Sequence, residues 1–448
     1  MDTKKLRQKI LDLAIHGKLV PQDPNDEPAS VLLERIRAEK ERLIAEGKIK
    51  RSKKSATSDT PHYEYIPDGW CISTIGEVFN LQAGKNISAN DIHEYSQNFP
   101  YACYGGNGIR GYVSDYNREG KFPIIGRQGA LCGNVNFAEG KFYATEHAVV
   151  VTCFAGVNVE WTRYVLEAMN LNQYATATAQ PGLSVATVNE VEFMLPPLNE
   201  QCRIAEFIAN CFEAIESLTT QTNDLRLNLD RAKSKILDLA IHGKLVPQDS
   251  NDEPASELLK RINPKAVASC DNPHYGNIPV GWIMLEGQYL FEPMKSIKPT
   301  EEFFKYIDID SIDNKRGIVT APKITPSKNA PSRASRYTCK GDVLFSMVRP
   351  YLRNIAIVPE NDCIASTGFF VCHPIPVMTS EFCYYLMTSS YIVDGLNQFM
   401  KGDNSPSINN ANITDWIYPI PPIEEQNRIV QKIKELYGTI DCITEALL

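Results

Sequence analysis

The sequence predicts an α+β protein with two globular mixed α/β domains separated by a pair of long antiparallel coiled-coil helices, in a pseudo-twofold and circular arrangement. Three observations predict this fold: a duplicated segment, a long heptad pattern, and chain ends that together imitate the middle of the chain. The segment KILDLAIHGKLVPQD stands at residues 9–23 and again at 235–249. Continued to Ser30 and Ser256, the two copies differ at one of 22 positions. The chain therefore contains an internal duplication.

The duplication extends beyond this segment. HYEYIPDGW at 62–70 returns as HYGNIPVGW at 274–282, and PPLNEQCRI at 196–204 returns as PPIEEQNRI at 421–429. Each half consists of the repeated helix and turn, an IPxGW motif, a divergent body and a PPxxEQ motif. The repeated parts are expected to hold geometry, whereas the divergent bodies are expected to differ in what they bind.

The chain ends complete the symmetry. The repeat offset is 225 residues at the PPxxEQ motif and 226 at the duplicated segment, so Leu448 corresponds to Asn223 and Met1 to Leu227. Laid end to start, the two termini reproduce the central segment except for Asp224–Arg226. This relationship predicts the circular, pseudo-twofold arrangement.

The central segment carries a heptad pattern that predicts a helix from Asn199 to His242, about 66 Å long at roughly 1.5 Å per residue. Pro196 and Pro197 precede it, Asn199 is a candidate cap, and Gly243 ends it. An ordinary amphipathic core helix is the alternative, but such helices average only about 11 to 12 residues. The predicted seam is Ile204, Ile208, Cys211, Ile215, Leu218, Thr222, Leu225, Leu229, Ala232, Ile236 and Leu239.

The chain ends supply an apolar partner for this seam. The candidates are Ile429, Ile433, Leu436, Ile440, Ile443 and Leu447, followed by Leu6, Ile10 and Leu13.

His16 and His242 occupy the same repeat position in the last turn of a helix. An imidazole there satisfies terminal carbonyls, so we expect capping rather than catalysis. Gly17 and Gly243 follow and are expected in the left-handed conformation.

Composition limits the class of protein. With 448 residues and 43% hydrophobic content, the chain can build two or three packed domains. The sequence has no apolar run of membrane-spanning length and no secretory signal core, which predicts no membrane contact. Twelve cysteines without a CxxC pair favour reduced thiols in a cytoplasmic protein, most simply as small core residues, and predict no metal site.

The linker from Ile36 to His62 is 14 residues longer than its counterpart from Ile262 to His274. It predicts a short helix that ends near Gly47, followed by a disordered basic tail over 48–58.

Local charge suggests nucleic-acid binding despite a net charge of -8. Lys323 to Arg353 contains seven basic residues and one acidic residue, and Tyr95 to Tyr143 contains ten aromatics among Gly, Asn, Arg and Gln. Such residues can read base edges. Either stretch can equally be a solvated face or a sheet core.

The sequence contains no phosphate loop, no GxGxxG fingerprint and no polar residue before Pro-Pro-aromatic of the kind amino-methyltransferases carry. The ExK triplets at Glu46, Glu119 and Glu139 all lie in EGK turn sequences. They give only weak support to a nuclease. We expect no catalytic residue in this chain.

The duplicated KILDLAIHGKLVPQD, the PPLNEQ and PPIEEQ motifs, IPDGW and IPVGW, and the body phrases GDVLFSMVRPYLRNIAIV and GRQGALCGNVNF resemble the specificity subunit of Type I restriction-modification enzymes over essentially the whole chain. The resemblance implies that each body is a target recognition domain for one half of a bipartite, asymmetric DNA site. The implied domains are a conserved helix, turn and basic linker at 1–60, target recognition domain 1 at 61–195, a central helix and turn at 196–262, target recognition domain 2 at 263–418, and a conserved helix at 419–448.

Side chains of the two bodies are expected to contact DNA, Arg suiting guanine and Asn or Gln suiting adenine. In the first body the candidates are Tyr104, Asn107, Arg110, Arg127, Gln128 and Asn134. In the second they are Arg333, Arg336, Arg349, Tyr351 and Arg353, with Lys323, Lys328 and Lys401 for phosphates. Arg349, beside Pro350, is alternatively a structural turn residue.

The resemblance implies a non-catalytic subunit without a cofactor of its own. Its partners would be double-stranded DNA, two methyltransferase subunits docked on the conserved helices, and restriction and translocase subunits bound through them. S-adenosylmethionine, Mg²⁺ and ATP would belong to these partners. A coiled-coil adaptor with two divergent ligand-binding domains is the main alternative, and its binding would lack the steep salt dependence of a DNA complex. A stand-alone nuclease is the third.

Overall fold

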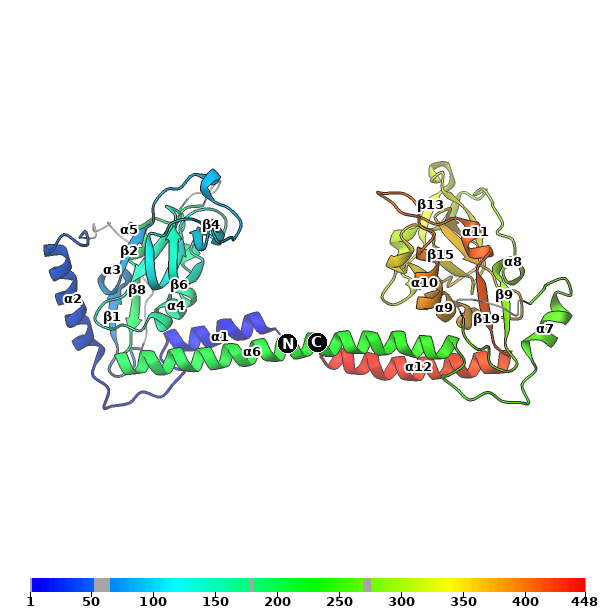
Figure 1. Cartoon of the computed structure of the whole chain (residues 1–448), viewed down its shortest axis with the longest axis horizontal. Helices are drawn as coiled ribbons and strands as arrows, with labels where there is room; N and C mark the ends of the chain where they lie inside the picture. The colour runs from blue at the N-terminus through cyan, green and yellow to red at the C-terminus, as the bar shows by residue number, and fades with distance from the viewer. Residues whose placement is uncertain (1, 52–64, 177–180, 269–274, 448) are drawn as a thin grey trace. The chain divides into compact units, whose positions relative to one another are not determined.

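The computed structural model describes residues 2–51, 65–176, 181–268 and 275–447. The chain divides into two compact units, Met1–Gln221 and Thr222–Leu448. Each unit joins a β-rich body to long helices (Figure 1), which confirms the predicted α+β class. Of the basic tail predicted over 48–58, residues from 52 onward lie outside the described residues.

The predicted long helix is present as α6, Leu198–Ile241, with 44 residues. Its ends agree with the prediction to one residue at each side. The predicted cap is wrong, because Asn199 lies inside the first turn and its side-chain amide donates to Asp26 Oδ1 at 3.1 Å. The chain already turns into the helix at Leu198, directly after the two prolines.

In the first unit, α1 (Thr3–Ile15) runs antiparallel to the first part of α6. The Arg7 guanidinium lies over the Phe212 ring at 4.6 Å. Further along α1, Leu11 is buried in the same apolar cluster as Ile204 and Ile208. The partner predicted from the N-terminal end is therefore present.

In the second unit, α12 (Ile423–Ala446) runs antiparallel to the last part of α6. The Tyr437 hydroxyl donates to the Lys233 carbonyl at 3.0 Å, and Lys233 Nζ lies 2.5 Å from Asp441 Oδ1. Ile429 and Ile433 are fully buried, as the seam prediction requires.

The heptad seam is not buried along its whole length. The side chains of Leu218 and Leu225 are 50% and 40% exposed, and the predicted partner residues Leu6 and Ile443 are also exposed. The prediction of an unbroken buried seam is wrong at these positions. Periodicity identifies the apolar stripe of a helix, but burial also needs a neighbouring helix opposite each residue.

The turn after each repeated helix matches the prediction. Nδ1 of His16 and of His242 lies 2.7 Å from the carbonyl oxygen four residues earlier. Gly17 and Gly243 have φ values of +64° and +63°. A side chain at Gly17 would put its Cβ 2.4 Å from Pro67 Cγ, so this close approach also requires glycine.

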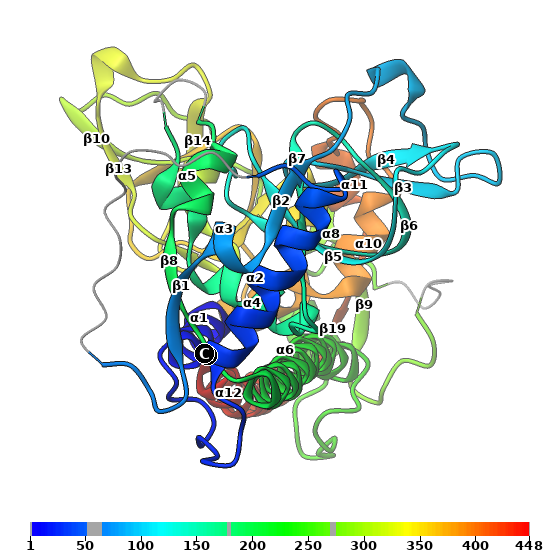
Figure 2. The same ribbon diagram turned by 90° about the vertical axis from the view of Figure 1, so that its left-hand side faces the viewer.

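The linker extension lengthens a helix. In the first unit α2 spans Ala29–Ala45, 17 residues, whereas its counterpart α7 spans Ala255–Ile262, eight residues. The helix ends close to Gly47, as predicted. Lys40 on the added turns donates to the carbonyls of Gly76 and Phe79, which ties α2 to α3 (Ile75–Val78; Figure 2).

The body of the first unit is built on a six-stranded sheet of order β2-β7-β5-β6-β3-β4. One face of this sheet carries the buried Val149 and Val151, which belong to the same cluster as the helix residue Trp161. The strands are β2 (Asn80–Ala83), β3 (Tyr101–Gly105), β4 (Gly108–Val113), β5 (Arg118–Gly126), β6 (Val135–Ala144) and β7 (Ala148–Thr152), and the helices are η1 (Ala89–Asp91), α4 (Val159–Ala168), η2 (Leu171–Tyr174) and α5 (Val185–Asn189).

The body of the second unit contains a five-stranded sheet of order β11-β12-β16-β15-β18 and a four-stranded sheet of order β13-β10-β17-β14. The strands are β10 (Phe303–Ile307), β11 (Ile312–Asp313), β12 (Ile318–Val319), β13 (Lys323–Pro326), β14 (Ala334–Thr338), β15 (Val343–Ser346), β16 (Ile355–Ile357), β17 (Cys363–Ser366) and β18 (Phe369–Cys372). The helices are α8 (Gly287–Leu290), η3 (Ile309–Ser311), η4 (Ser327–Asn329), η5 (Pro350–Leu352), α9 (Ser380–Thr388), α10 (Ser390–Asn397) and α11 (Asn410–Thr414).

Both bodies are closed by the same two-stranded ladder. The strand that follows the IPxGW motif pairs antiparallel with the strand that precedes the PPxxEQ motif. In the first unit β1 (Cys71–Thr74) pairs with β8 (Glu192–Leu195), and in the second β9 (Ile283–Glu286) pairs with β19 (Ile417–Ile420). The two motifs therefore meet at the base of each body.

The repeated motifs hold the base of the first unit through one buried carboxylate. Glu200 of the PPLNEQ motif is 1% exposed. Its Oε2 accepts from Trp70 Nε1 at 2.9 Å and its Oε1 from Gln22 Nε2 at 3.1 Å. Burial raises the pKa of this carboxyl above its usual value, and both hydrogen bonds lower it in part. We call this three-residue network the carboxylate clasp.

The second unit contains the same clasp. Glu425 accepts from Trp282 Nε1 at 3.0 Å and from Gln248 Nε2 at 3.0 Å, and burial raises the pKa of its carboxyl as well. Because the three partners come from three repeated motifs, the clasp explains why those motifs recur together.

Two further interactions occur in both units beside the clasp. Arg203 donates to Asp26 at 2.6 Å, and Arg428 donates to Asp252 at 2.5 Å. The neighbouring glutamine of each PPxxEQ motif accepts a hydrogen bond from the N-cap residue of a body helix, at 3.1 Å in the first unit and 2.8 Å in the second. Much of the duplicated sequence thus fastens the body of each unit to its long helices.

Candidate nucleic-acid interface

The six DNA-contact candidates of the first unit gather at one end of the sheet, in two adjacent segments. One segment is the β3–β4 turn with Asn107, and the other is the loop between β5 and β6 with Gln128 and Asn134. Asn134 Nδ2 donates to Asn107 Oδ1 at 3.3 Å. Gly126 lies so close to the turn that a Cβ there would be 1.7 Å from the Gly106 carbonyl oxygen.

The candidates differ in exposure. Asn107, Arg110, Gln128 and Asn134 are exposed, while Arg127 is half-buried. Within the described residues neither Arg110 nor Arg127 has a side-chain hydrogen bond or ion pair, so both guanidinium groups are available to an outside acceptor.

Tyr104 has a more structural environment than predicted. It is half-buried, its hydroxyl donates to the Phe137 carbonyl at 3.3 Å, and its ring contacts Phe142 edge to face. Burial raises the pKa of its hydroxyl above the usual value. The residue supports the end of β3.

Sequence reasoning missed three polar residues beside this cluster. The side-chain atoms Asn136 Nδ2, Thr145 Oγ1 and Glu146 Oε2 are buried and have no hydrogen-bond partner among the described residues. Buried polar atoms usually have a partner. The signal available in the sequence was their position within the polar, aromatic stretch Tyr95–Tyr143 for Asn136, and directly after it for Thr145 and Glu146.

In the second unit three arginines and one lysine of the predicted set lie together. Arg349 and Arg353 flank Tyr351 in the loop between β15 and β16. The segment with Lys401 lies alongside, because the Arg349 N–H donates to the Pro406 carbonyl at 2.8 Å and Lys401 pairs with Ser407 through two backbone hydrogen bonds. Arg333 lies next to the turn that contacts this loop, since its carbonyl accepts from Thr367 N at 2.8 Å and the neighbouring Gly368 carbonyl accepts from Met347 N at 2.9 Å.

Two of these arginines have partners within the unit. Arg349 donates to the Asn404 carbonyl at 2.8 Å. Arg353 donates to the carbonyl of Thr388 and lies 3.5 Å from the Asp394 carboxylate. Both guanidinium groups therefore hold neighbouring segments in place.

The remaining candidates lie on the four-stranded sheet or close to it. Lys323 on β13 pairs with Asp308 at 2.6 Å, which raises the pKa of its amine. Lys328 is exposed. Arg336 on β14 is half-buried, and its Nε is buried without a hydrogen-bond partner among the described residues.

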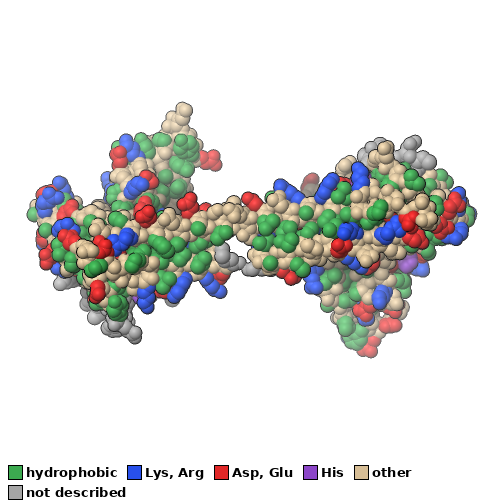
Figure 3. All heavy atoms as spheres, turned by 90° about the horizontal axis from the view of Figure 1, so that it is seen from below, with side chains coloured by type: hydrophobic (Ala, Val, Ile, Leu, Met, Phe, Trp, Pro, Cys, Tyr) green, Lys and Arg blue, Asp and Glu red, His purple; other side chains and the backbone are tan. Residues whose placement is uncertain are grey.

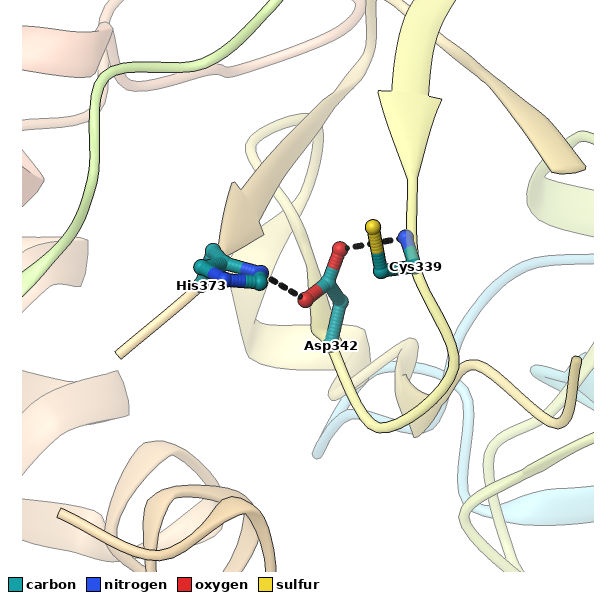
Figure 4. Close-up of side chains that lie close together, drawn as sticks. All are labelled: Cys339, Asp342 and His373. Carbon is teal, nitrogen blue, oxygen red and sulfur yellow. Dashed lines mark hydrogen bonds and ion pairs between the residues drawn. The ribbon is translucent and has the colours of Figure 1, made fainter. Parts of the chain in front are cut away.

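Cys339, Asp342 and His373 form a group whose potential metal-donor atoms all lie within 4.8 Å of one another (Figure 4). Sulfur, carboxylate and imidazole are donors that suit Zn²⁺. However, the Asp342 carboxylate already accepts from the Cys339 N–H at 2.7 Å and contacts His373 Nδ1 at 2.5 Å. These contacts give the carboxylate a structural role in the turn between β14 and β15.

Two general features of the chain accompany these sites. Eleven cysteines are free within the described residues. Among the helices in the described part of the chain, none combines the length and apolar character needed to cross a membrane.

The family model described as "Type I restriction modification DNA specificity domain" matches residues 67–227 and 293–447. The chain belongs to this specificity family. The two matches lie one in each half of the chain, in agreement with the internal duplication.

Two relatives in the specificity family align with nearly the whole chain, and a third aligns with about a third of it. The EcoEI specificity subunit of Escherichia coli is 30% identical, with 99% of this chain and 90% of that subunit aligned. The EcoAI specificity subunit of the same organism is 25% identical over 97% of this chain and 89% of the subunit. The EcoprrI specificity subunit of Escherichia coli is 43% identical over 37% of this chain, and the chain spans 41% of that subunit's length.

A solved structure shares the fold of the specificity family. It is described as "Structural basis underlying complex assembly and conformational transition of the type I R-M system" and has a TM-score of 0.54 with 17% identity. The match covers 86% of this chain and 94% of the other.

Proposed function

We propose that this specificity subunit reads a bipartite, asymmetric DNA site, with one target recognition domain for each half-site. The observation that carries the proposal is the contrast within each unit. The carboxylate clasp is the same in both units, whereas the exposed residues at the body ends differ completely. A constant scaffold with different recognition surfaces is typical of a protein that binds two different sequences.

The proposed target recognition domains are residues 61–195 and 263–418. The segments 1–60, 196–262 and 419–448 form the scaffold in this proposal. The bases would be read by the exposed polar side chains at the end of each body, and phosphates by Lys323, Lys328 and Lys401. Arg349, Arg353 and Tyr104 are weaker candidates for base contacts because their polar groups already have partners within the chain.

The long helices are the proposed docking surface for two methyltransferase subunits, which in turn would bind the restriction and translocase subunits. Hydrophobic side chains lie exposed among charged ones on the helical surface (Figure 3). Phe207 in the first unit and Leu225 and Leu227 in the second are 45%, 40% and 50% exposed. Apolar side chains of this size on a helix are suited to packing against another helix.

The chain itself would perform no chemical step. S-adenosylmethionine, Mg²⁺ and ATP belong to the partner subunits in this proposal. The contribution of the chain would be to select the DNA sequence at which those subunits act.

The test is methylome sequencing of a host strain with and without this chain, co-expressed with its neighbouring methyltransferase. The expected result is a bipartite motif with a fixed gap that is methylated only when the chain is present. An active methyltransferase and a soluble complex without any chain-dependent motif would contradict the proposal and favour an adaptor.

A further inference from the structure

The two bodies share a loop that their sequences do not reveal. In the first unit it runs from Gly126 to Asn134, and in the second from Ser346 to Asn354. Both loops are closed by a hydrogen bond from the first N–H to the last carbonyl, at 2.9 Å and 3.1 Å. The sequences within them, RQGALCG and MVRPYLR, have no position in common. We call these segments the equivalent loops.

An internal hydrogen bond supports the correspondence. The Cys132 N–H donates to the Gly129 carbonyl at 3.0 Å, and the Leu352 N–H donates to the Arg349 carbonyl at 2.9 Å. Each pair spans three residues and stands at the same place in its loop. The two loops therefore contain the same turn at the same place.

The equivalent loops also contact the same neighbouring segment of their unit. Gly129 N donates to the Pro181 carbonyl at 2.9 Å, and Arg349 N donates to the Pro406 carbonyl at 2.8 Å. Pro181 and Pro406 both precede the short helix that leads to the PPxxEQ motif. The loop is therefore fixed to the equivalent segment of each unit in the same way.

Two positions of the loop are left-handed in both units. Gly129 and Gly133 have φ values of +91° and +86°, and their counterparts Arg349 and Arg353 have φ values of 48° and 53°. A residue with a Cβ costs about 1 kcal/mol or more in this conformation. Since the second unit carries arginine at both positions, its loop keeps this backbone at an energetic cost, and the arginine side chains hold the neighbouring segments.

The side chain between the two left-handed positions points to solvent in both units. Leu131 is 55% exposed and its counterpart Tyr351 is 47% exposed. Exposed side chains of this size are ordinary when isolated. Here they occur at the same position of two loops with dissimilar sequences. Leu131 lies close to Arg127 and Gln128 in the sequence, and Tyr351 lies between two arginines. Packing within the unit does not explain this shared exposure.

We propose that the equivalent loops are the DNA-reading loops of the two units, and that Leu131 and Tyr351 contact DNA directly. The inference rests on the proposed function and names the residues that carry it. Leu131 offers an apolar surface suited to a thymine methyl group or a sugar, and Tyr351 offers a ring suited to the face of a sugar or an unstacked base. Leu131 was absent from the sequence-based candidates.

The loops are better suited to binding DNA than to binding one kind of protein partner at both units. Neither loop contains Asp or Glu, and between them they carry Arg127, Arg349 and Arg353. A protein that binds once to each unit would require the same side chains in both loops. The carboxylate clasp shows this pattern, because the same three residue types recur in both units. The loops instead keep the same closing hydrogen bond and change every side chain between their first and last residues, as two different half-sites require.

The experiment uses the chain in complex with its methyltransferase and a duplex that carries the motif obtained by methylome sequencing. Binding of wild type, Leu131→Ala and Tyr351→Ala is measured on this duplex and on duplexes with single substitutions at each recognised base pair. Each variant is expected to bind the cognate duplex about tenfold more weakly, equivalent to about 1.4 kcal/mol. Each is also expected to lose discrimination in one half-site only, a different one for each variant.

Matched controls are Ile72→Ala and Val280→Ala, which remove exposed apolar side chains of the same two units outside the loops; Ile72 is 41% and Val280 is 89% exposed. These controls are expected to bind as wild type, and Leu131→Met, which keeps the apolar bulk, is expected to retain most of the affinity. Loop variants that bind and discriminate like the controls would overturn the inference while leaving the proposed function intact. Absence of any chain-dependent motif would instead refute the proposed function.

Discussion

The indole N–H of Trp70 donates a hydrogen bond to the Glu200 carboxylate across 2.9 Å, although 130 residues separate them in the chain. Trp282 and Glu425 repeat this contact in the second unit at 3.0 Å. Both carboxylates are almost completely buried and accept from a glutamine at the other oxygen. Each clasp joins the strand that opens a body, the turn after a repeated helix and the first turn of a long helix.

Loss of a clasp carboxylate should loosen the unit that contains it. Glu200→Ala leaves a buried indole N–H and a glutamine amide without their acceptor, which costs about 1 to 3 kcal/mol of stability for an unsatisfied group. We expect faster hydrogen exchange at the base of the first unit, and in the second unit after Glu425→Ala. Glu206→Ala, an exposed position on the same helix as Glu200, is the control. Equal exchange in Glu200→Ala and the control would contradict the role of the clasp.

The clasp also predicts a dependence on pH. Burial raises the folded-state pKa of Glu200 above its usual value of 4.5, so the folded chain takes up this proton more readily than the unfolded chain. The stabilising contribution of the protonated form is complete below about 4.5 and is lost as pH rises through the folded pKa. Relative to Glu200→Gln, which does not titrate, the wild type should therefore gain stability as pH falls from 7 through the folded pKa of Glu200 to about 4.5. Denaturant unfolding of both proteins across this range measures the difference. A constant difference would show that the carboxyl does not titrate there.

The Asp26–Arg203 pair should act in the opposite direction. The hydrogen bond from Arg203 lowers the pKa of the Asp26 carboxyl below its usual value of 3.8. This pair therefore contributes stability above about pH 3.8 and loses it as pH falls through the folded pKa. Asp26→Asn should therefore be less stable than the wild type at pH 7, and this difference in free energy of unfolding should be smaller at pH 3. Denaturant unfolding of both proteins at the two pH values measures it. A difference that is the same at both pH values would contradict this ion pair as its source.

Substitution of two left-handed glycines by alanine can distinguish the cost of backbone strain from the cost of a steric clash. Gly17→Ala adds both, because the Cβ would lie 2.4 Å from Pro67 Cγ. Gly47→Ala adds strain alone, since its φ is +69° and no atom lies within 4 Å of the added Cβ. We expect Gly47→Ala to cost about 1 to 2 kcal/mol and Gly17→Ala clearly more. Thermal unfolding of the two variants measures the order, and equal losses would exclude a packing effect at the helix end.

Arg353 and Arg333 should respond differently to removal. Arg353→Ala loses contacts with Thr388 and Asp394 and is expected to cost about 1 kcal/mol of stability in the second unit. Arg333→Ala, at an exposed residue, should leave stability unchanged and reduce DNA binding. Melting temperatures and duplex binding of both variants decide between the roles. The opposite pattern would make Arg353 the base contact and Arg333 structural.

A phosphate contact should be visible in the salt dependence of binding. Lys328→Ala is expected to weaken binding to all duplex sequences alike and to reduce the slope of log affinity against log salt by about one. Lys265→Ala, an exposed lysine of the same unit, is the control and should leave the slope unchanged. A sequence-dependent loss at Lys328 would indicate base reading instead.

The sequence predicted the scaffold more completely than the site. The limits of α6 follow from Pro196 and Pro197 before it and Gly243 after it, which are local signals. The exposure of Leu218 and Leu225 depends on which helix lies opposite, and periodicity carries no such information. The match between Leu131 and Tyr351 could not be predicted for a similar reason, since the loops share backbone hydrogen bonds but no residue between their ends. The clasp lay in the repeated motifs, but only the folded chain joins residues that stand 130 to 178 positions apart.

The clasp also bears on how the chain is made. Its longest contacts span 178 residues in the first unit and 177 in the second, so each unit lacks its fastening until its last motif has been synthesised. The first unit can close while the ribosome is still translating the second body. The second unit can close its clasp only after Glu425 has been synthesised. A ribosome stalled short of that motif would release a chain with a finished first unit and an open second one, a form exposed to proteolysis and aggregation.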